Sequence, residues 1–382
     1  MRGVALLGST GSIGCSALKV IERHADSFRI VALAANRNAH ELGVQVQQHR
    51  PSLAVLVDED AAAGNGPLHP CIRVGRAALL EAAAHPDADI VINAVVGAAG
   101  LEVTLTALLA GKRLALANKE SLVAGGPLVR AALLRGGGEL IPVDSEHSAI
   151  LQCISGAPDS SLRRMILTAS GGPFRGWTED RLAAVTPAQA LRHPTWDMGA
   201  KVTVDSATLA NKALEVVEAH FLFDAPYDAI DVVVHPQSVI HSMVEFVDGS
   251  VLAQLGFPTM ELPILYSLTH PARLPDSGTR AFDPVAAGAL TFEPVDVQRF
   301  RAFALGVAAG RLGGTAPAVF NAANEVAVAG FLAGAIPFTA IADVVAGALD
   351  ALGTTPADSL DAVLAADSRA REIAGAALRK TC

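Results

Sequence analysis

The stretch LLGSTGSIG, from Leu6 to Gly14, decides the fold that the sequence predicts. It follows the apolar segment Val4–Leu7, and its glycines have the spacing G-x-x-G-x-x-G at the expected start of a helix. Glycines let the backbone approach a pyrophosphate, and a helix N-terminus supplies N–H donors and the positive end of a dipole. A glycine pattern alone is weak, but its place at the first strand-to-helix turn favours a dinucleotide site over a purely structural tight turn.

Apolar segments and Ala-rich helical segments alternate over the first part of the chain. Strands separated by helices are typical of βαβ units in a parallel sheet. We therefore predict an α/β, Rossmann-type dinucleotide-binding domain over residues 1–145, with helices that include Leu101–Ala110 and Leu128–Arg135. Its expected strands are Val4–Leu7, Ile30–Ala34, Leu53–Val57, Ile90–Val95, Arg113–Ala117 and Glu139–Val143.

The pattern changes near residue 146, where we expect a central α+β catalytic domain that continues to residue 270. RRMILTAS and AIDVVVHP are expected strands, and SVIHSMVEFVDGSVLAQLGF is expected to form a hairpin that turns at Asp248-Gly249. The expected helices here are Ala183–Leu191 and Asp205–Phe223. A stretch with proline and glycine, residues 271–296, is expected to be a linker, and residues 297–382 are expected to form a C-terminal helical domain.

Composition excludes several classes of protein. A formal charge of −9 over 382 residues, with a pI of about 5.6, disfavours a nucleic-acid partner. No basic and apolar leader follows Met1, and the longest uncharged apolar run is broken by Gly330, Gly334 and Pro337, so we expect no signal peptide and no membrane span. The cysteines have no zinc or disulfide spacing, which indicates reduced thiols and a cytoplasmic location.

The segment after the second expected strand bears on the choice of cofactor. An NAD enzyme usually presents an acid to the ribose there, whereas this chain has Asn36, Arg37 and Asn38. A guanidinium suits a 2′-phosphate, so NADP is favoured over NAD, the alternative being that Arg37 is an ordinary exposed charge. ANKES follows a later strand, at the sheet edge where ligands bind, and makes Lys119 a candidate for contact with cofactor and substrate, the alternative being a surface residue at a helix start.

Two segments together predict a cation site. In VDSEHSAI, Asp144 and Glu146 would face the same way if this segment is extended, and such close carboxylates need a neutralising charge. Oxygen ligands indicate Mg²⁺ or Mn²⁺, although a helix cap in a solvated loop is the plainer alternative. In VDSATLANKALEVVEAH, Asn211, Lys212 and Glu215 share a helix face, and Glu215 is the expected third ligand. A surface ion pair between Lys212 and Glu215 is the alternative there.

Two further segments suggest an anion site and a lid. ASGGPFRGW contains Ser170 in a glycine turn that can direct N–H groups and a hydroxyl inward. RHPTWDMGAK carries His193 and, between a proline and a glycine, Trp196, which favours a mobile loop over a packed tryptophan. His235 and His241 are better explained as core or hairpin histidines than as ligands.

Taken together, these segments resemble 1-deoxy-D-xylulose 5-phosphate reductoisomerases, the NADPH- and metal-dependent enzymes of the methylerythritol phosphate route to isoprenoids. The resemblance covers nearly the whole chain. Family members often carry Gly-Lys-Asn where this chain has Asn36, Arg37 and Asn38. The matching stretches are GSTGSIG, ANKES, PVDSEHSAI, TASGGPFR, HPTWDMGAK, VDSATLANKALEVVEAH, HPQSVIHSMVEF and NAANEVAV.

The resemblance implies a role for each matching residue. One divalent cation, Mg²⁺ or Mn²⁺ with Co²⁺ as a further candidate, is held by Asp144, Glu146 and Glu215. Lys119 and Ser145 contact the substrate beside it, and His235 lies near the site. The remaining implied substrate contacts are Ser170, Ser206, Asn211 and Lys212, mainly at the phosphate, with His193, Trp196 and Met198 in a closing loop. The implied NADPH contacts are Thr10, Gly11, Ser12, Ile13, Asn36, Arg37, Asn38, Asn118, Glu120 and Gly199.

The implied reaction converts a phosphorylated ketose, 1-deoxy-D-xylulose 5-phosphate, to 2-C-methyl-D-erythritol 4-phosphate by rearrangement and reduction. The catalytic residues would be Lys119, Asp144, Glu146, Glu215 and His193, in a homodimer built through the central domain. A homoserine- or semialdehyde-type dehydrogenase is a rival that would retain activity after chelation. An NADP-sensing regulator is a second rival, which would bind NADPH without turnover.

Overall fold

A computed structural model describes residues 1–64, 69–196 and 198–381. The chain forms two compact units, each assembled from separate segments. The first unit contains Met1–Ser121, Leu128–Ser148 and Thr259–Arg280, and the second contains the rest. Residues 259–280, which the sequence analysis divides between the central domain and the linker, thus belong to the first unit.

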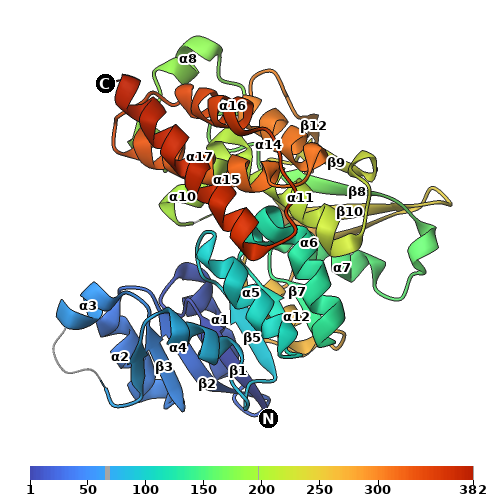
Figure 1. The fold of residues 1–382 in the computed structure, drawn as a ribbon. Helices are drawn as coiled ribbons and strands as arrows, with labels where there is room; N and C mark the ends of the chain where they lie inside the picture. The colour runs from blue at the N-terminus through green and yellow to red at the C-terminus, as the bar shows by residue number, and fades with distance from the viewer. Residues whose placement is uncertain (65–68, 197, 382) are drawn as a thin grey trace. The chain divides into compact units, whose positions relative to one another are not determined.

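The first unit is built on a seven-stranded parallel sheet with the order β4-β3-β2-β1-β5-β6-β7 (Figure 1). Six of these strands were expected from the sequence, and the Rossmann-type prediction is confirmed. The edge strand β4 was not, because it has only three residues, two of which are exposed. The strands are β1 (Arg2–Leu7), β2 (Phe28–Ala35), β3 (Leu53–Leu56), β4 (Ile72–Val74), β5 (Ile90–Asn93), β6 (Arg113–Leu116) and β7 (Glu139–Pro142).

Helices connect the strands of this sheet. The apolar side chains of α1 pack with those of β1 and β2, and Ile264, Leu265 and Leu268 of α12 complete the same core from much later in the chain. The helices are α1 (Ser12–Arg23), α2 (Ala39–His49), α3 (Glu59–Gly64), α4 (Arg76–Ala83), α5 (Ala99–Leu109), α6 (Lys119–Gly136), α7 (Ser145–Ile154) and α12 (Glu261–Thr269).

The glycine loop lies where the strand order of the sheet reverses. β1 has β2 on one side and β5 on the other, so the loops after β1 and β5 open beside each other at their carboxyl ends. Gly8 has a φ of +95°, which side chains avoid. A Cβ on Gly14 would lie 2.3 Å from the carbonyl oxygen of Gly8, so α1 can start this close to the loop only because Gly14 has no side chain.

The second unit is built on a five-stranded mixed sheet with the order β11-β10-β8-β9-β12. β8 and β9 are parallel, and the other neighbours are antiparallel. β10 and β11 form the expected hairpin around Asp248-Gly249. The strands are β8 (Leu162–Ala169), β9 (Ile230–Val234), β10 (Ile240–Phe246), β11 (Val251–Leu255) and β12 (Glu293–Pro294).

Helices make up most of the remaining second unit, and the prediction of a helical C-terminal part is confirmed. Buried aromatic side chains, among them Phe174, Phe320 and Phe331, fill the core around α15. The helices are α8 (Glu179–Ala183), α9 (Pro187–Ala190), α10 (Ala200–Thr208), α11 (Ala210–Phe223), α13 (Pro284–Ala287), α14 (Arg301–Leu312), α15 (Ala316–Leu332), α16 (Ala340–Leu352) and α17 (Leu360–Thr381), with short 3-10 turns at Asp159–Ser161 and Tyr227–Ala229.

Three expectations for this unit are wrong in detail. The expected helix Asp205–Phe223 is two helices, because Leu209 adopts the left-handed conformation between α10 and α11. The expected helix Ala183–Leu191 is replaced by α8 and α9, the second of which starts at a capping box on Thr186. The stretch 271–296 is more than a linker, since it contains α13 and also β12, which pairs with β9.

No helix in the described part of the chain is long and apolar enough to cross a membrane. The apolar run before Asp343 instead contributes Ala327, Val328 and Phe331 to the core of the second unit.

The glycine loop yields a test of the packing argument. Gly14→Ala should lower the free energy of unfolding by about 1–3 kcal/mol, because the added methyl meets rigid backbone. Gly11→Ala is the matched control, since its nearest atom outside the adjacent residues would be 3.5 Å away. Urea denaturation of both variants checks this, and equal stability of the two would contradict it.

Candidate active site

The expected cofactor residues of the first unit gather at the carboxyl end of its sheet. Gly11 and Ser12 are exposed at the start of α1, and Thr10 and Ile13 are partly exposed beside them. Gly11 occupies the N-cap position with no side chain to satisfy the first N–H groups of α1. These N–H groups are oriented as donors for an anionic group, as dinucleotide-binding turns require.

Arg37 lies just beyond β2, with Asn36 and Asn38 on either side, and all three residues are exposed. The Arg37 guanidinium donates through Nε to Asp58 Oδ2 at 2.6 Å, and Asn38 caps α2 by accepting from the Glu41 N–H. Asp58 also accepts from the Ala61 N–H, and this bond together with Arg37 holds the pKa of the Asp58 carboxyl below its usual range. One edge of the Arg37 guanidinium is therefore held by Asp58, a residue that the sequence alone did not indicate.

Asn118 is a buried connector between two loops of the first unit. Its amide nitrogen donates to the carbonyl oxygens of Val95 and Gly97, at 2.7 and 3.0 Å, and to Glu120. Its oxygen accepts from the Ser121 N–H and so caps α6. The side chain of Asn118 thus shapes the loops after β5 and β6, the first of which lies beside the glycine loop at the strand-order reversal.

Asp144 and Glu146 do not lie in an extended segment, so the same-face argument from strand geometry is wrong. β7 ends at Pro142, and Glu146 is in the first turn of α7, whose first hydrogen bond runs from the Ser148 N–H to the Asp144 carbonyl. The helical start still keeps the two acids close in sequence and space. Acidic groups at a helix N-terminus are favoured by the dipole.

The Asp144 carboxylate forms an ion pair with Lys119 from the start of α6. Burial acts to raise the pKa of Asp144, but Lys119 and His147 outweigh it, and the pKa lies well below its usual range. Ser145 donates its hydroxyl to Glu146. The first unit therefore presents two carboxylates, a hydroxyl and an ammonium at the adjoining starts of α6 and α7.

The prediction that Asn211, Lys212 and Glu215 share a helix face is confirmed. Asn211 donates its amide to one oxygen of Glu215, and Lys212 donates its ammonium to the other. Lys212 is 4% exposed and Glu215 1%, so the alternative of a surface ion pair is wrong. A carboxylate buried this deeply needs polar partners, and here a cation and an amide supply them.

His193 connects two serines of the second unit through one ring nitrogen. Its Nε2 lies 3.0 Å from Ser170 Oγ and 3.1 Å from Ser206 Oγ, while its Nδ1 accepts from the N–H groups of Thr195 and Trp196. Because Nδ1 is an acceptor, the neutral ring carries its proton on Nε2 and donates toward the serines. Burial lowers the pKa of His193, which agrees with this neutral tautomer.

The turn after β8 brings Ser170 close to Ser206. Gly171 and Gly172 both have positive φ angles, and a Cβ on Gly172 would lie 2.6 Å from the Ser206 carbonyl oxygen. The Gly172 N–H also donates to Ser170 Oγ. Glycine is therefore required for this turn to pack against α10, which gathers two hydroxyls and an imidazole at one place.

The expected closing loop is only partly described. Trp196 is partly buried and its ring lies 6.3 Å from that of His241, while Met198 is partly buried and Asp197 lies outside the described residues. Gly199 is exposed at the N-cap of α10. His235 has both ring nitrogens bonded to backbone, at Thr291 and Val239, which supports its interpretation as a core histidine.

Comparison with known sequences decides the family. Three family models match the chain: 1-deoxy-D-xylulose 5-phosphate reductoisomerase over residues 4–126, its C-terminal domain over 140–223, and the DXP reductoisomerase C-terminal domain over 255–373. A relative with that name from Symbiobacterium thermophilum is 53% identical over 98% of both chains. Another, from Ralstonia nicotianae, is 50% identical over 100% of this chain and 99% of its own. The chain belongs to the 1-deoxy-D-xylulose 5-phosphate reductoisomerase family.

Solved reductoisomerase structures agree with the fold. The enzyme from Zymomonas mobilis in complex with NADPH matches with a TM-score of 0.90 and 43% identity, covering 99% of both chains. A reductoisomerase in complex with NADPH, fosmidomycin and magnesium matches with a TM-score of 0.93 and 38% identity, covering 99% of this chain and 98% of that one. The arrangement of an N-terminal parallel sheet, a mixed sheet and C-terminal helices is thus that of reductoisomerases.

The hydrogen-bonded histidine yields a prediction about pH. An unfolded histidine titrates near ~6.5, and the pKa of folded His193 is lower. Below about pH 6.5 the unfolded chain therefore binds a proton that the folded chain rejects, so the stabilising contribution of His193 falls as pH decreases. The difference in unfolding free energy between the wild type and His193→Gln should shrink from pH 8 to pH 5.5. The other histidines are common to both proteins, and a difference that is constant across this range would refute the assignment.

Proposed function

We propose that this chain catalyses the NADPH- and divalent-metal-dependent conversion of 1-deoxy-D-xylulose 5-phosphate to 2-C-methyl-D-erythritol 4-phosphate, a step in the supply of isoprenoid precursors. The observation that carries this proposal is the similarity of this chain, over its full length, to reductoisomerases that are 53% and 50% identical to it. Structures of reductoisomerases with NADPH and with magnesium support both cofactors. The chemistry of the described side chains fits each of them.

Asp144, Glu146 and Glu215 are the proposed ligands of the cation. The fit rests on their donor chemistry, because Mg²⁺ and Mn²⁺ prefer oxygen ligands. Asp144 and Glu215 each face an ammonium, from Lys119 and Lys212, and the pKa of Asp144 lies well below its usual range. Once bound, the ion supplies Lewis acidity toward a carbonyl and hydroxyl oxygen of the ketose.

The remaining side chains position and activate the substrate. Lys119 and Ser145 are proposed to contact the reacting end of the sugar, where the Lys119 ammonium can stabilise negative charge on oxygen during carbon–carbon cleavage and re-addition. Ser170, Ser206 and His193 are proposed to bind the phosphate, since their hydroxyls and one N–H meet at one place. Phosphate binding away from the reacting carbons can then drive closure of the site.

Asn211 and Lys212 complete the proposed substrate contacts. The Lys212 ammonium donates to Glu215, and its other N–H groups could donate to the phosphate. Trp196 and Met198 are proposed to cover the bound sugar as part of a mobile loop. A change in Trp196 fluorescence on adding a phosphorylated substrate analogue with metal tests this movement, and an unaltered signal would contradict it.

NADPH is proposed to bind along the carboxyl end of the parallel sheet. Thr10, Gly11, Ser12 and Ile13 would face its pyrophosphate, as the exposed N–H groups of α1 suggest. Arg37 would meet the 2′-phosphate, with Asn36 and Asn38 beside it. The further proposed contacts are Asn118, Glu120 and Gly199, the last from the second unit.

A cytoplasmic homodimer is the proposed state of the protein. The β11 edge of the second unit exposes Val251, Leu252 and Leu255, and an apolar edge strand is a common site of pairing between chains. Sedimentation velocity tests this, and a monomer at micromolar concentration would contradict it.

Removal of a ligand to the cation tests the activity directly. Glu215→Gln should lower kcat for 1-deoxy-D-xylulose 5-phosphate, followed by NADPH absorbance, by about a hundredfold or more, because several kcal/mol of stabilisation are lost. The Kd for NADPH should stay unchanged. Glu245→Gln is the control, a buried acid of the second unit that pairs with Arg164. Turnover by the wild type that survives chelation, or by Glu215→Gln at low metal, would exclude the proposed site.

Removal of the Arg37 guanidinium tests the choice of cofactor. Arg37→Ala should weaken NADPH binding by about tenfold or more, the effect of one lost charged hydrogen bond, and weaken NADH binding much less. Asp58→Asn shows whether the acid beside Arg37 matters, because it keeps a hydrogen-bond acceptor but removes the charge. Equal weakening of both cofactors by Arg37→Ala would contradict the assignment.

A further inference from the structure

The junction between α10 and α11 separates two groups of proposed substrate-binding residues. Ser206 lies near the end of α10, and Asn211 and Lys212 lie in the first turn of α11. Between them Leu209 has a φ of +58°, a left-handed conformation that is unfavourable for a residue with a side chain. Such a conformation persists only where neighbouring contacts determine it.

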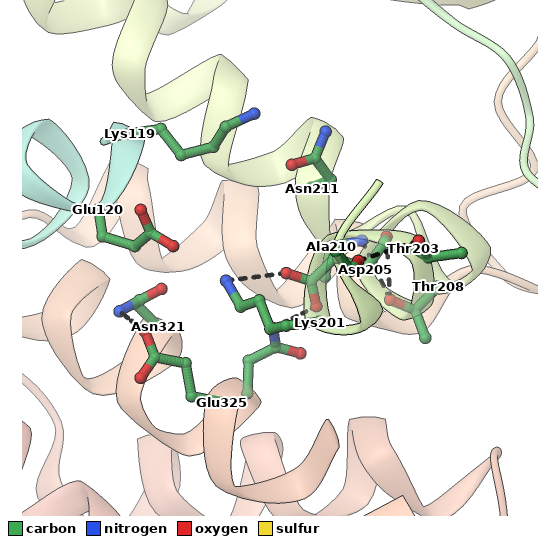
Figure 2. Close-up of polar contacts among 12 residues, drawn as sticks. Lys119, Glu120, Lys201, Thr203, Asp205, Thr208, Ala210, Asn211, Asn321 and Glu325 are labelled. Carbon is green, nitrogen blue, oxygen red and sulfur yellow. Dashed lines mark hydrogen bonds and ion pairs between the residues drawn. The ribbon is translucent and has the colours of Figure 1, made fainter. Parts of the chain in front are cut away.

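Asp205 supplies those contacts from inside the protein. Its side chain is fully buried, and its Oδ1 accepts from Asn324 Nδ2 at 2.8 Å. Its Oδ2 forms an ion pair with Lys201 Nζ at 2.9 Å, as Figure 2 shows. Asn324 belongs to α15, so the carboxylate connects α10 to the C-terminal helices across more than a hundred positions of sequence.

The backbone of Asp205 takes part in the same junction. Its carbonyl accepts from the Thr208 hydroxyl at 3.2 Å, and that hydroxyl accepts in turn from the Ala210 N–H at 3.3 Å. One residue therefore connects the last turn of α10, the first residue of α11 and the C-terminal helices.

Helix stability does not account for this arrangement. Lys201 lies in the first turn of α10, where a positive charge opposes the helix dipole, and a lysine that precedes its acid is the weaker orientation of such a pair. A buried carboxylate also costs several kcal/mol of desolvation in general. The ion pair of Lys201 with Asp205 is better explained as a contact that holds Asp205, and with it the α10–α11 junction, in place.

We propose that Asp205 and Asn324 are positioning residues that fix the α10–α11 junction, so that Ser206 and Lys212 keep the geometry needed to bind the substrate phosphate. This inference rests on the proposed phosphate site. It makes the C-terminal helical part of the chain necessary for substrate affinity, although neither residue is proposed to touch the substrate.

The test compares two asparagines of one helix. Asn324→Ala should raise KM for 1-deoxy-D-xylulose 5-phosphate about tenfold, while kcat changes less than about threefold and the Kd for NADPH stays constant. Asn321→Ala is the matched control: Asn321 is also fully buried on α15, but it donates to Glu325 of its own helix (Figure 2). It should lower the thermal midpoint similarly and leave KM unchanged. Equal increases of KM in both variants, or none in Asn324→Ala, would overturn the proposal.

Exchange of the two side chains keeps the test decisive if an alanine variant folds poorly. Asn324→Asp alone places two carboxylates together and should raise KM, and adding Asp205→Asn should restore most of it, because the hydrogen bond can re-form in reverse. A double variant no better than the single one refutes the coupling. Ser206→Ala distinguishes failure of the phosphate site from failure of the positioning role. An unchanged KM in Ser206→Ala refutes both. A raised KM in Ser206→Ala, with no effect of Asn324→Ala, refutes the positioning role alone.

Discussion

Ion pairs between buried carboxylates and lysines govern the arrangement of the candidate site. Asp144 faces Lys119, Glu215 faces Lys212, and Asp205 faces Lys201. A buried carboxylate without a partner is costly, so each of these acids requires a cation beside it. Each of these pairs lies within one unit of the fold.

The architecture follows from local patterns to a large extent. The parallel strands of the first unit are short apolar segments bounded by turns, and their alternation with helices leaves little choice of topology. Failures occur where a nonlocal contact overrides a local pattern. Leu209 lies in a stretch with continuous helical periodicity. That stretch contains no glycine or proline to predict the break between α10 and α11. Asp144 follows a strand, yet the chain turns into α7 instead of continuing extended.

In the candidate site, too, local spacing was predictable from the sequence and nonlocal contacts were not. The cluster around Glu215 was predictable because helical spacing alone places Asn211 and Lys212 beside it. The pairing of His193 with Ser170 and Ser206 was not predictable, because the three residues come from separate segments. Which ring nitrogen of His193 carries the proton also depends on backbone N–H groups. Nothing in the segment of Asp58 indicates its role, and Asn324 lies in a family-matching stretch that assigns it none. Their importance arises only from the residues they face, Arg37 and Asp205.

The interleaving of the two units has a consequence for biosynthesis. Domains usually fold as they leave the ribosome, the N-terminal one first. Here Ile264, Leu265 and Leu268 belong to the same core as Val4 and Leu6, so the earliest strands cannot complete their packing until α12 has been translated. Nascent chains that stop short of α12 would therefore leave part of that apolar core uncovered.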